Sequence, residues 1–138
     1  MKLYDAWIKE HSRSPRFQPP LAEFTHKARC NNPLCGDRVD ITVQIEDGKL
    51  AALGMKARAC AITKASASLM SLLVTGQPLA ALPALAERAK AAVDADEPAP
   101  TDRDEMAPLV VVRTAPSRRR CATLPWEALL EAVAMERS

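Results

Sequence analysis

A strict alternation of apolar and polar residues over 39–46 is the clearest pattern in the chain. A period of two is typical of a strand that buries one face. Asp47-Gly48 follows, and this pair suits the positive backbone angles of a type I′ turn. Alternation then resumes over 53–57. The pattern therefore predicts a β-hairpin that ends near Cys60.

Four other stretches show the apolar spacing of a helix, with apolar residues three and four positions apart. Gly76 follows the second stretch as a predicted C-cap, and Pro83 suits the first turn of the third. Thr123 is predicted to cap the fourth. The predicted helices cover 3–10, 61–75, 83–93 and the stretch from Thr123 that contains Trp126, Leu129, Leu130 and Val133.

Three segments lie between these elements. The proline-containing residues between the first helix and Val39 are predicted to be irregular. Residues 94–105 contain six acidic side chains and one arginine, which indicates a solvated loop. By propensity alone, Leu109–Val112 would form a strand.

Composition limits the classes of function. A chain of 138 residues with 48% hydrophobic and 26% charged residues is expected to form one globular domain over 1–138. A net charge of +2 argues against a nucleic-acid binder, which must neutralise several phosphates. No stretch approaches the roughly 20 apolar residues of a membrane span, and no apolar signal core follows Met1. We therefore expect a cytoplasmic protein that binds neither nucleic acid nor membrane.

The chain has four cysteines, which are too few for a disulfide scaffold. They indicate metal binding or thiol chemistry instead. Their spacing fits no local zinc finger, so any shared site must be assembled by the fold. Thiols at loop tips and helix starts favour the thiolate, and Asp37 could add a carboxylate. The alternative is a set of small buried apolar side chains. The four cysteines are Cys30, Cys35, Cys60 and Cys121.

Three motifs along the chain resemble the SufU-type branch of the IscU/NifU-like iron–sulfur assembly proteins, and they occur in the order found in that family. The likeness extends from the first predicted helix to the last. Arg120 stands where the IscU scaffolds have a ligand histidine, and the acidic 94–105 stretch is similar to an insertion of the SufU branch. Both features favour SufU. The motifs are NPLCGD at 32–37, CAIT with ASASLM at 60–70, and RRRCATLPW at 118–126.

This resemblance implies an α+β fold, with a small antiparallel sheet of about three strands packed against a layer of helices. It also implies that Leu109–Val112 is a loop or short helix instead of a strand. In two places the chain departs from the family pattern. Ala59 replaces the usual glycine before the second cysteine, and Cys30 is an additional thiol.

The resemblance further implies a zinc ion held by four side chains. It implies a SufS-type, PLP-dependent cysteine desulfurase as partner, and a downstream iron–sulfur scaffold or apo-protein as acceptor. Three thiolates and one carboxylate around Zn²⁺ leave a formal charge of −2, which Arg118 is expected to offset. A solvated basic run at 118–120 is the alternative role for that arginine. The implied ligands are Cys35, Asp37, Cys60 and Cys121.

The function expected from this family is zinc-dependent sulfur transfer in iron–sulfur cluster biogenesis. Because a closed zinc site suppresses thiolate reactivity, we hypothesise that a donor from the desulfurase displaces Cys35, which then accepts persulfide sulfur. One alternative is a scaffold that builds a transient iron–sulfur cluster on Cys35, Cys60 and Cys121. Another is a zinc-stabilised interaction module without sulfur chemistry.

Some residues stay outside this scheme. Cys30 could replace Asp37 as fourth ligand, but the family pattern favours Asp37. His11 and His26 match no family ligand and are expected at the surface. Ser66, with no adjacent base, is expected only to permit close helix packing.

Overall fold

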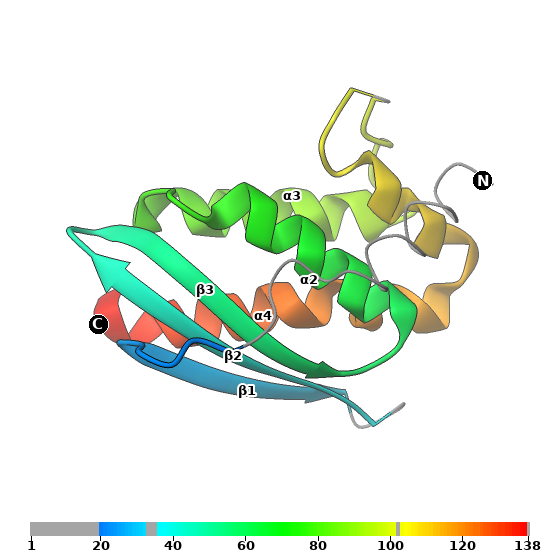
Figure 1. Ribbon diagram of the computed structural model, residues 1–138. Helices are drawn as coiled ribbons and strands as arrows, with labels where there is room; N and C mark the ends of the chain where they lie inside the picture. The colour runs from blue at the N-terminus through cyan, green and yellow to red at the C-terminus, as the bar shows by residue number, and fades with distance from the viewer. Residues whose placement is uncertain (1–19, 33–35, 102, 138) are drawn as a thin grey trace.

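The computed structural model describes residues 20–32, 36–101 and 103–137. Three strands form an antiparallel sheet in the order β1-β2-β3. Three α-helices lie on one side of it, and Figure 1 shows this arrangement. The elements are β1 (His26–Asn32), β2 (Asp37–Glu46), β3 (Lys49–Arg58), α2 (Ala61–Val74), η1 (Leu79–Ala81), α3 (Leu82–Val93), η2 (Ala107–Thr114), η3 (Pro116–Arg118) and α4 (Arg119–Arg137).

The hairpin of β2 and β3 confirms the alternation in the sequence. Asp47 and Gly48 have φ angles of 53° and 74°, as a type I′ turn requires. Val39, Ile41 and Val43 are at most 1% exposed, so one face of β2 forms the floor of the core. The alternate residues of β2 therefore point to the opposite face of the sheet.

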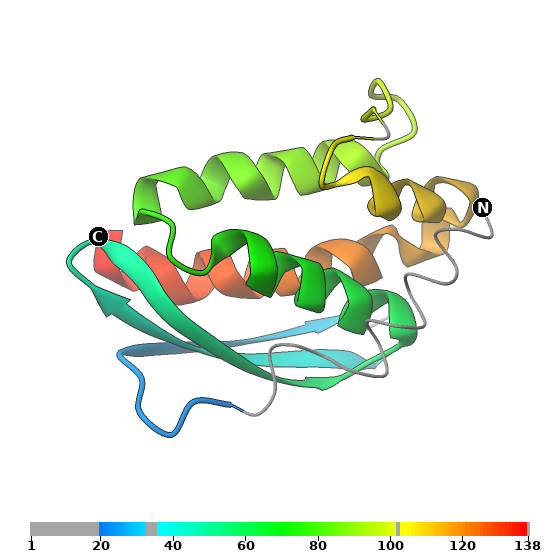
Figure 2. The same cartoon turned by 45° about the horizontal axis from the view of Figure 1, so that its top comes forward.

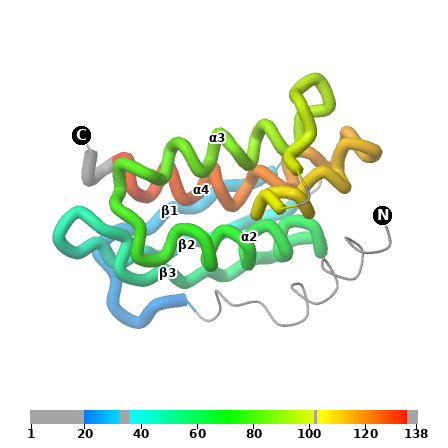
Figure 3. Tube along the Cα trace, turned by 90° about the horizontal axis from the view of Figure 1, so that it is seen from above, coloured from blue at the N-terminus to red at the C-terminus, as the bar shows by residue number. Residues whose placement is uncertain are grey.

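The helices form two levels above the sheet (Figure 2). α2 and α4 lie directly on it, with α4 against β1 and β2, and α3 packs on α4 farther from the strands. Seen from above, the three helices run alongside one another (Figure 3). Trp126 and Leu129 of α4 are fully buried. This confirms the expected fold class, a small antiparallel sheet covered by helices.

Two helix boundaries agree with the sequence pattern. α2 ends at Val74, and Gly76 has a φ of +87°, the left-handed conformation that glycine adopts without strain just after a helix. Pro83 lies in the first turn of α3. The helix expected over 3–10 lies outside the described residues.

Two expectations were wrong, and for a third segment the family resemblance was right where β-propensity was wrong. Residues 26–32, predicted to be irregular, form β1, and its polar side chains hid its alternation. Leu109–Val112 belongs to the 3₁₀ helix η2, which contradicts β-propensity and agrees with the family pattern. Thr123 is not an N-cap, because α4 already begins at Arg119. None of the helices within the described ranges is long and apolar enough to cross a membrane.

Candidate metal centre

Five element ends gather at one end of the sheet, at the right of Figure 1. β1 ends there and β2 begins, and β3 ends where α2 starts. The first turn of α4 arrives at the same place. The segments that contain the second and third sequence motifs, far apart in the chain, thus meet beside the first.

Asp37 is the first residue of β2 and is only 6% exposed. The turn before it closes with a hydrogen bond of 2.9 Å from the Gly36 N–H to the Asn32 carbonyl. Gly36 has a φ of +74°, and a side chain would be strained in this left-handed conformation. The glycine of the first motif therefore lets the chain turn back into β2 and delivers a carboxylate to the sheet end.

Cys60 is the N-cap residue of α2, in an extended conformation with φ −72° and ψ 168°. Its carbonyl accepts the first helical hydrogen bond, from the Lys64 N–H at 3.1 Å. The Cys60 side chain thus lies at the N-terminus of α2.

Cys121 lies in the first turn of α4 and is 1% exposed. The next peptide is anchored to α2, because the Ser66 hydroxyl donates a 2.5 Å hydrogen bond to the carbonyl of Ala122. The Trp126 indole N–H in turn donates to the Ser66 oxygen at 3.1 Å. This buried chain of hydrogen bonds fixes the start of α4 against α2 and so fixes the position of the Cys121 thiol.

The side chains of Asp37, Cys60 and Cys121 place one ligand atom each within 4.8 Å of one another. Ligands of a four-coordinate zinc bonded through sulfur and oxygen at 2.0–2.3 Å lie about 3.3–3.8 Å apart, so small side-chain rotations complete the geometry. Two thiolates and a carboxylate are also a donor set that zinc accepts. The three described residues fit a metal centre.

Arg118 lies at the open side of this group. Its guanidinium is near enough to the cysteines to interact electrostatically with both Cys60 and Cys121. The negative charge of the Cys60 thiolate, and to a smaller degree that of Cys121, raises the pKa of Arg118 above its ordinary value. The exposed arginine can thus offset the excess negative charge that the sequence predicted for the site.

The predicted fourth ligand, Cys35, lies outside the described residues. Cys30, the alternative ligand, is not part of the group formed by Asp37, Cys60 and Cys121. Its thiol instead donates a hydrogen bond to Glu131 of α4 at 3.2 Å. The geometry thus groups Asp37, and not Cys30, with the two described cysteines.

Thr63 contacts two members of this group, and the sequence pattern gave it no role. Its hydroxyl donates to the Oδ2 atom of Asp37 at 3.0 Å and lies 3.5 Å from the sulfur of Cys60. Its position was a usable signal, because the third residue of a helix after its N-cap reaches back toward that cap. The hydrogen bonds of Ser66 to α4 had no comparable signal in the sequence.

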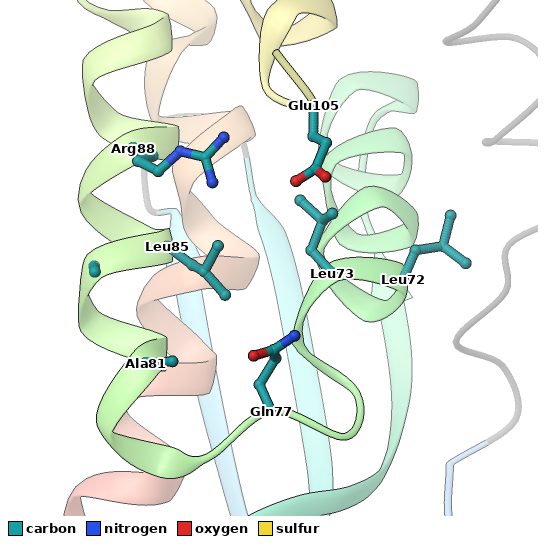
Figure 4. Close-up of a pocket in the computed structure, with 8 residues that line it drawn as sticks. Leu72, Leu73, Gln77, Ala81, Leu85, Arg88 and Glu105 are labelled. Carbon is teal, nitrogen blue, oxygen red and sulfur yellow. The ribbon is translucent and has the colours of Figure 1, made fainter. Parts of the chain in front are cut away.

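A groove of about 550 Å³ lies between α2 and α3, away from the cysteines (Figure 4). Leu73 and Leu85 project into it, and Arg88 at its rim pairs with Asp104 at 2.8 Å. Its lining holds no thiol. It opens near the C-terminal end of α2, which is about 20 Å from Cys60 at 1.5 Å per residue over 14 residues. The groove is therefore separate from the cysteine site.

Comparison with known proteins gives a consistent likeness. Residues 3–137 match the family model described as NifU-like N terminal domain. The iron–sulfur cluster assembly scaffold protein IscU of Streptococcus pyogenes serotype M1 is 33% identical over 95% of this chain and 82% of its own length. The zinc-dependent sulfurtransferase SufU of Bacillus subtilis strain 168 is 29% identical over 97% of this chain and 91% of its own length.

A solved structure extends the likeness to three dimensions. The N-terminal part of a nitrogen-fixing NifU-like protein from Brucella abortus superposes with a TM-score of 0.86 and 25% identity. The superposition covers 98% of this chain and 96% of that one.

Proposed function

Because the chain belongs to the NifU-like N-terminal domain family of iron–sulfur cluster assembly scaffold proteins, we propose that it transfers sulfur in cluster biogenesis in a zinc-dependent manner. The observation that carries the proposal is the group of Asp37, Cys60 and Cys121, whose two cysteines interact electrostatically with Arg118. The SufU likeness supports zinc as the metal, and the proposed sulfur donor is a SufS-type, PLP-dependent cysteine desulfurase.

We assign the zinc ligands as Cys35, Asp37, Cys60 and Cys121. The first of these lies two residues before Asp37 in the sequence, across Gly36. Bound zinc would keep the coordinating thiols deprotonated and join the β1–β2 turn to the starts of α2 and α4. Thr63 holds the Asp37 carboxylate in place for this role through its hydrogen bond to Oδ2.

Cys35 is the proposed sulfur acceptor. Its thiolate attacks the terminal sulfur of the cysteine persulfide on the desulfurase, and a new S–S bond forms. The S–S bond of the donor persulfide breaks, and the electron pair leaves with the cysteine thiolate of the desulfurase. Cys35 becomes a persulfide with no net oxidation, and the sulfur passes on to a downstream scaffold or apo-protein.

Arg118 supports this exchange electrostatically. Its cation lies at the sulfur atoms of Cys60 and Cys121 and is itself exposed. An exposed cation beside a group of thiolates can also attract an approaching anionic persulfide. We therefore assign Arg118 to the approach of the partner as well as to charge balance.

The test is stimulation of a cysteine desulfurase by Cys35→Ala, with Cys30→Ala as the matched control. The desulfurase should stay at its slow basal turnover with Cys35→Ala and reach full alanine and sulfide production with Cys30→Ala. Full stimulation by Cys35→Ala would overturn the assignment of the acceptor. Zinc binding without a persulfide on any cysteine in mass spectra would instead indicate a zinc-stabilised interaction module.

The second candidate is a scaffold that assembles a transient iron–sulfur cluster on Cys35, Cys60 and Cys121. The observation that favours it is the 33% identity to a protein named as an IscU scaffold. Arg120 at the position before the last cysteine favours the sulfurtransferase instead. The test is to reconstitute a cluster on the chain anaerobically and then to add an apo-protein. Transfer of the cluster to the apo-protein faster than free iron and sulfide can build one there would decide for the scaffold.

A further inference from the structure

The face of the sheet opposite the helices has a strong excess of positive charge. The pairing register places its side chains in three rows, with Asn31, Arg38 and Arg58 in the row nearest the cysteines. The next row holds Arg29, Asp40 and Lys56, and the third holds Lys27, Thr42 and Gly54. Five cations surround one carboxylate, a net charge of +4. The basic sheet face is defined here as Lys27, Arg29, Arg38, Lys56 and Arg58.

The described elements leave most of this face open. The helices cover only the other side, as Figure 2 shows. Residues 20–21 touch the third row, where the Leu21 N–H donates to the Thr42 hydroxyl at 3.0 Å. Lys27, Lys56 and Arg58 are nevertheless exposed, and the side chain of Arg29 is 59% exposed. The described part of the chain therefore leaves these cations accessible to another molecule.

Internal ion pairs account for only part of the charge. Asp40 forms ion pairs with Arg29 and with Arg38, the latter at 3.6 Å between Nε and Oδ2. Within the described part of the chain, Lys27, Lys56 and Arg58 form no ion pair. A hollow of about 700 Å³ on this face lies among Lys27, Arg29, Asp40 and Lys56. The three cations that line it can accept carboxylate side chains.

The charge distribution of the molecule is polarised. The described part of the acidic segment 94–105 projects beyond the helices, on the side away from the sheet (Figure 1). The net charge of +2 therefore conceals a basic face and an acidic segment on opposite sides. Such an arrangement orients an approaching charged partner as well as attracting it.

The basic sheet face also reaches the candidate metal centre. Arg38 follows Asp37 directly, and Arg58 precedes Cys60 by two residues. These arginines are paired across β2 and β3 at the sheet end where the cysteines gather. A protein lying on this face would thus border the site at which sulfur is exchanged.

We propose that the basic sheet face is a docking surface for a carboxylate-rich face of the cysteine desulfurase that delivers sulfur to the chain. The inference rests on the proposed function, since that function supplies the partner. A protein surface fits this face better than a nucleic acid does. Asp40 at its centre would repel a phosphate, and the described helices, which could enter a groove, lie on the other side of the sheet. Carboxylates of a protein can be spaced around Asp40.

The experiment compares two double charge reversals of equal size. Lys27→Glu with Lys56→Glu alters the basic sheet face at a distance from the metal ligands. Lys90→Glu with Arg103→Glu, both exposed, changes the net charge equally on the helix side. Each protein is titrated into the PLP-dependent cysteine desulfurase of the same organism at low and high salt. Zinc content and the urea unfolding midpoint verify that both variants are folded and loaded.

We expect the basic-face variant to need about tenfold more protein for half-maximal stimulation at low salt, with the control within twofold of the unmodified chain. The difference should shrink at high salt, because exposed charges are screened. Equal behaviour of the two variants would overturn the docking surface and leave the sulfurtransferase function standing. Failure of the unmodified chain to stimulate would overturn that function, and this inference with it. Binding of a 20-base-pair DNA duplex that only the basic-face variant loses would assign the face to nucleic acid instead.

Discussion

The hydroxyl of Thr63 donates a hydrogen bond to the Oδ2 atom of Asp37 at 3.0 Å, in a fully buried position. The hydroxyl oxygen of Thr63 also lies 3.5 Å from the sulfur of Cys60. This threonine connects the first residue of β2 to the first turn of α2. Hydrogen bonds to a ligating carboxylate fix its orientation, which makes Thr63 part of the proposed metal centre.

Replacing Thr63 by valine should weaken zinc binding while leaving the ligands in place. Valine has nearly the same shape but cannot donate to Asp37. Loss of such a partner typically costs 10–100-fold in metal affinity, and we expect a loss of about that size. Competition with a chromogenic chelator measures it. Thr63→Ser retains the hydroxyl and should bind zinc within a few-fold of the unmodified chain, so an equal loss in both variants would indicate a packing effect.

Asp37→Ala and Cys30→Ala should differ in metal content. Asp37 belongs to the group of ligand atoms within 4.8 Å, whereas the Cys30 thiol is bonded to Glu131. We expect Asp37→Ala to be purified with strongly reduced zinc and Cys30→Ala with a full equivalent. Elemental analysis of protein prepared without chelator checks both. A zinc-depleted Cys30→Ala variant with normal Asp37→Ala loading would reverse the ligand assignment.

Cys30 should be the least reactive thiol of the described cysteines toward iodoacetamide. Partial burial and the hydrogen bond to Glu131 raise its pKa to about 12, with further contributions from the charges of Glu131 and Glu127. Arg120 opposes this shift. A raised pKa favours the protonated thiol, so Cys30 stays unreactive at pH 8 and becomes a thiolate only as the pH approaches 12.

Peptide mapping after alkylation over pH 7–10 provides the measurement. Glu131→Gln should increase the alkylation rate of Cys30 about tenfold, since it removes the neighbouring negative charge. Glu87→Gln on α3 serves as the control and should leave the rate unchanged. Rapid alkylation of Cys30 in the unmodified chain at pH 8 would contradict the hydrogen bond to Glu131.

The hairpin and the helices α2 and α3 could be predicted because their patterns are local. The alternation over 39–46, the Asp47-Gly48 turn and Gly76 each specify backbone geometry within a few residues. β1 was missed because its inward side chains are His26, Ala28, Cys30 and Asn32, which supply little apolar signal. That strand is held in place by pairing with β2 and packing against α4, both of which depend on distant residues.

The metal centre could be predicted only in part. Spacing alone identified thiols that the fold would have to assemble, and the family resemblance selected which of them to combine. The contacts of Thr63 and Ser66 depend on how α2 packs against β2 and α4, and no local rule contains that information. The start of α4 was misplaced because η2 and η3 lead directly into it without a polar cap residue.

Ser66→Ala should destabilise the protein more than a comparable serine change elsewhere in α2. Ser66 donates to the Ala122 carbonyl and accepts from the Trp126 indole, so alanine leaves a buried N–H and a buried carbonyl without this partner. We expect a loss of about 1–3 kcal/mol in the free energy of unfolding. Ser71→Ala removes only a bond to the Ser68 carbonyl in the same helix and should cost less than about 1 kcal/mol. Urea denaturation compares the two.

Arg118→Ala should separate sulfur acceptance from metal retention. The guanidinium interacts electrostatically with Cys60 and Cys121 but adds no metal ligand, so the variant should keep its zinc. Without the cation, the excess negative charge of the site is no longer offset, and an anionic persulfide meets greater repulsion. We expect stimulation of the desulfurase to fall at least tenfold.

Two further variants make the role of Arg118 specific. Arg118→Lys keeps the charge but loses the planar fork that contacts two sulfur atoms, and should recover only part of the stimulation. Arg88→Ala removes an arginine that pairs with Asp104 at the distant groove and should change nothing. A role in sulfur acceptance alone leaves the zinc bound. If Arg118→Ala lost zinc together with its activity, the arginine would instead be a structural support of the metal centre.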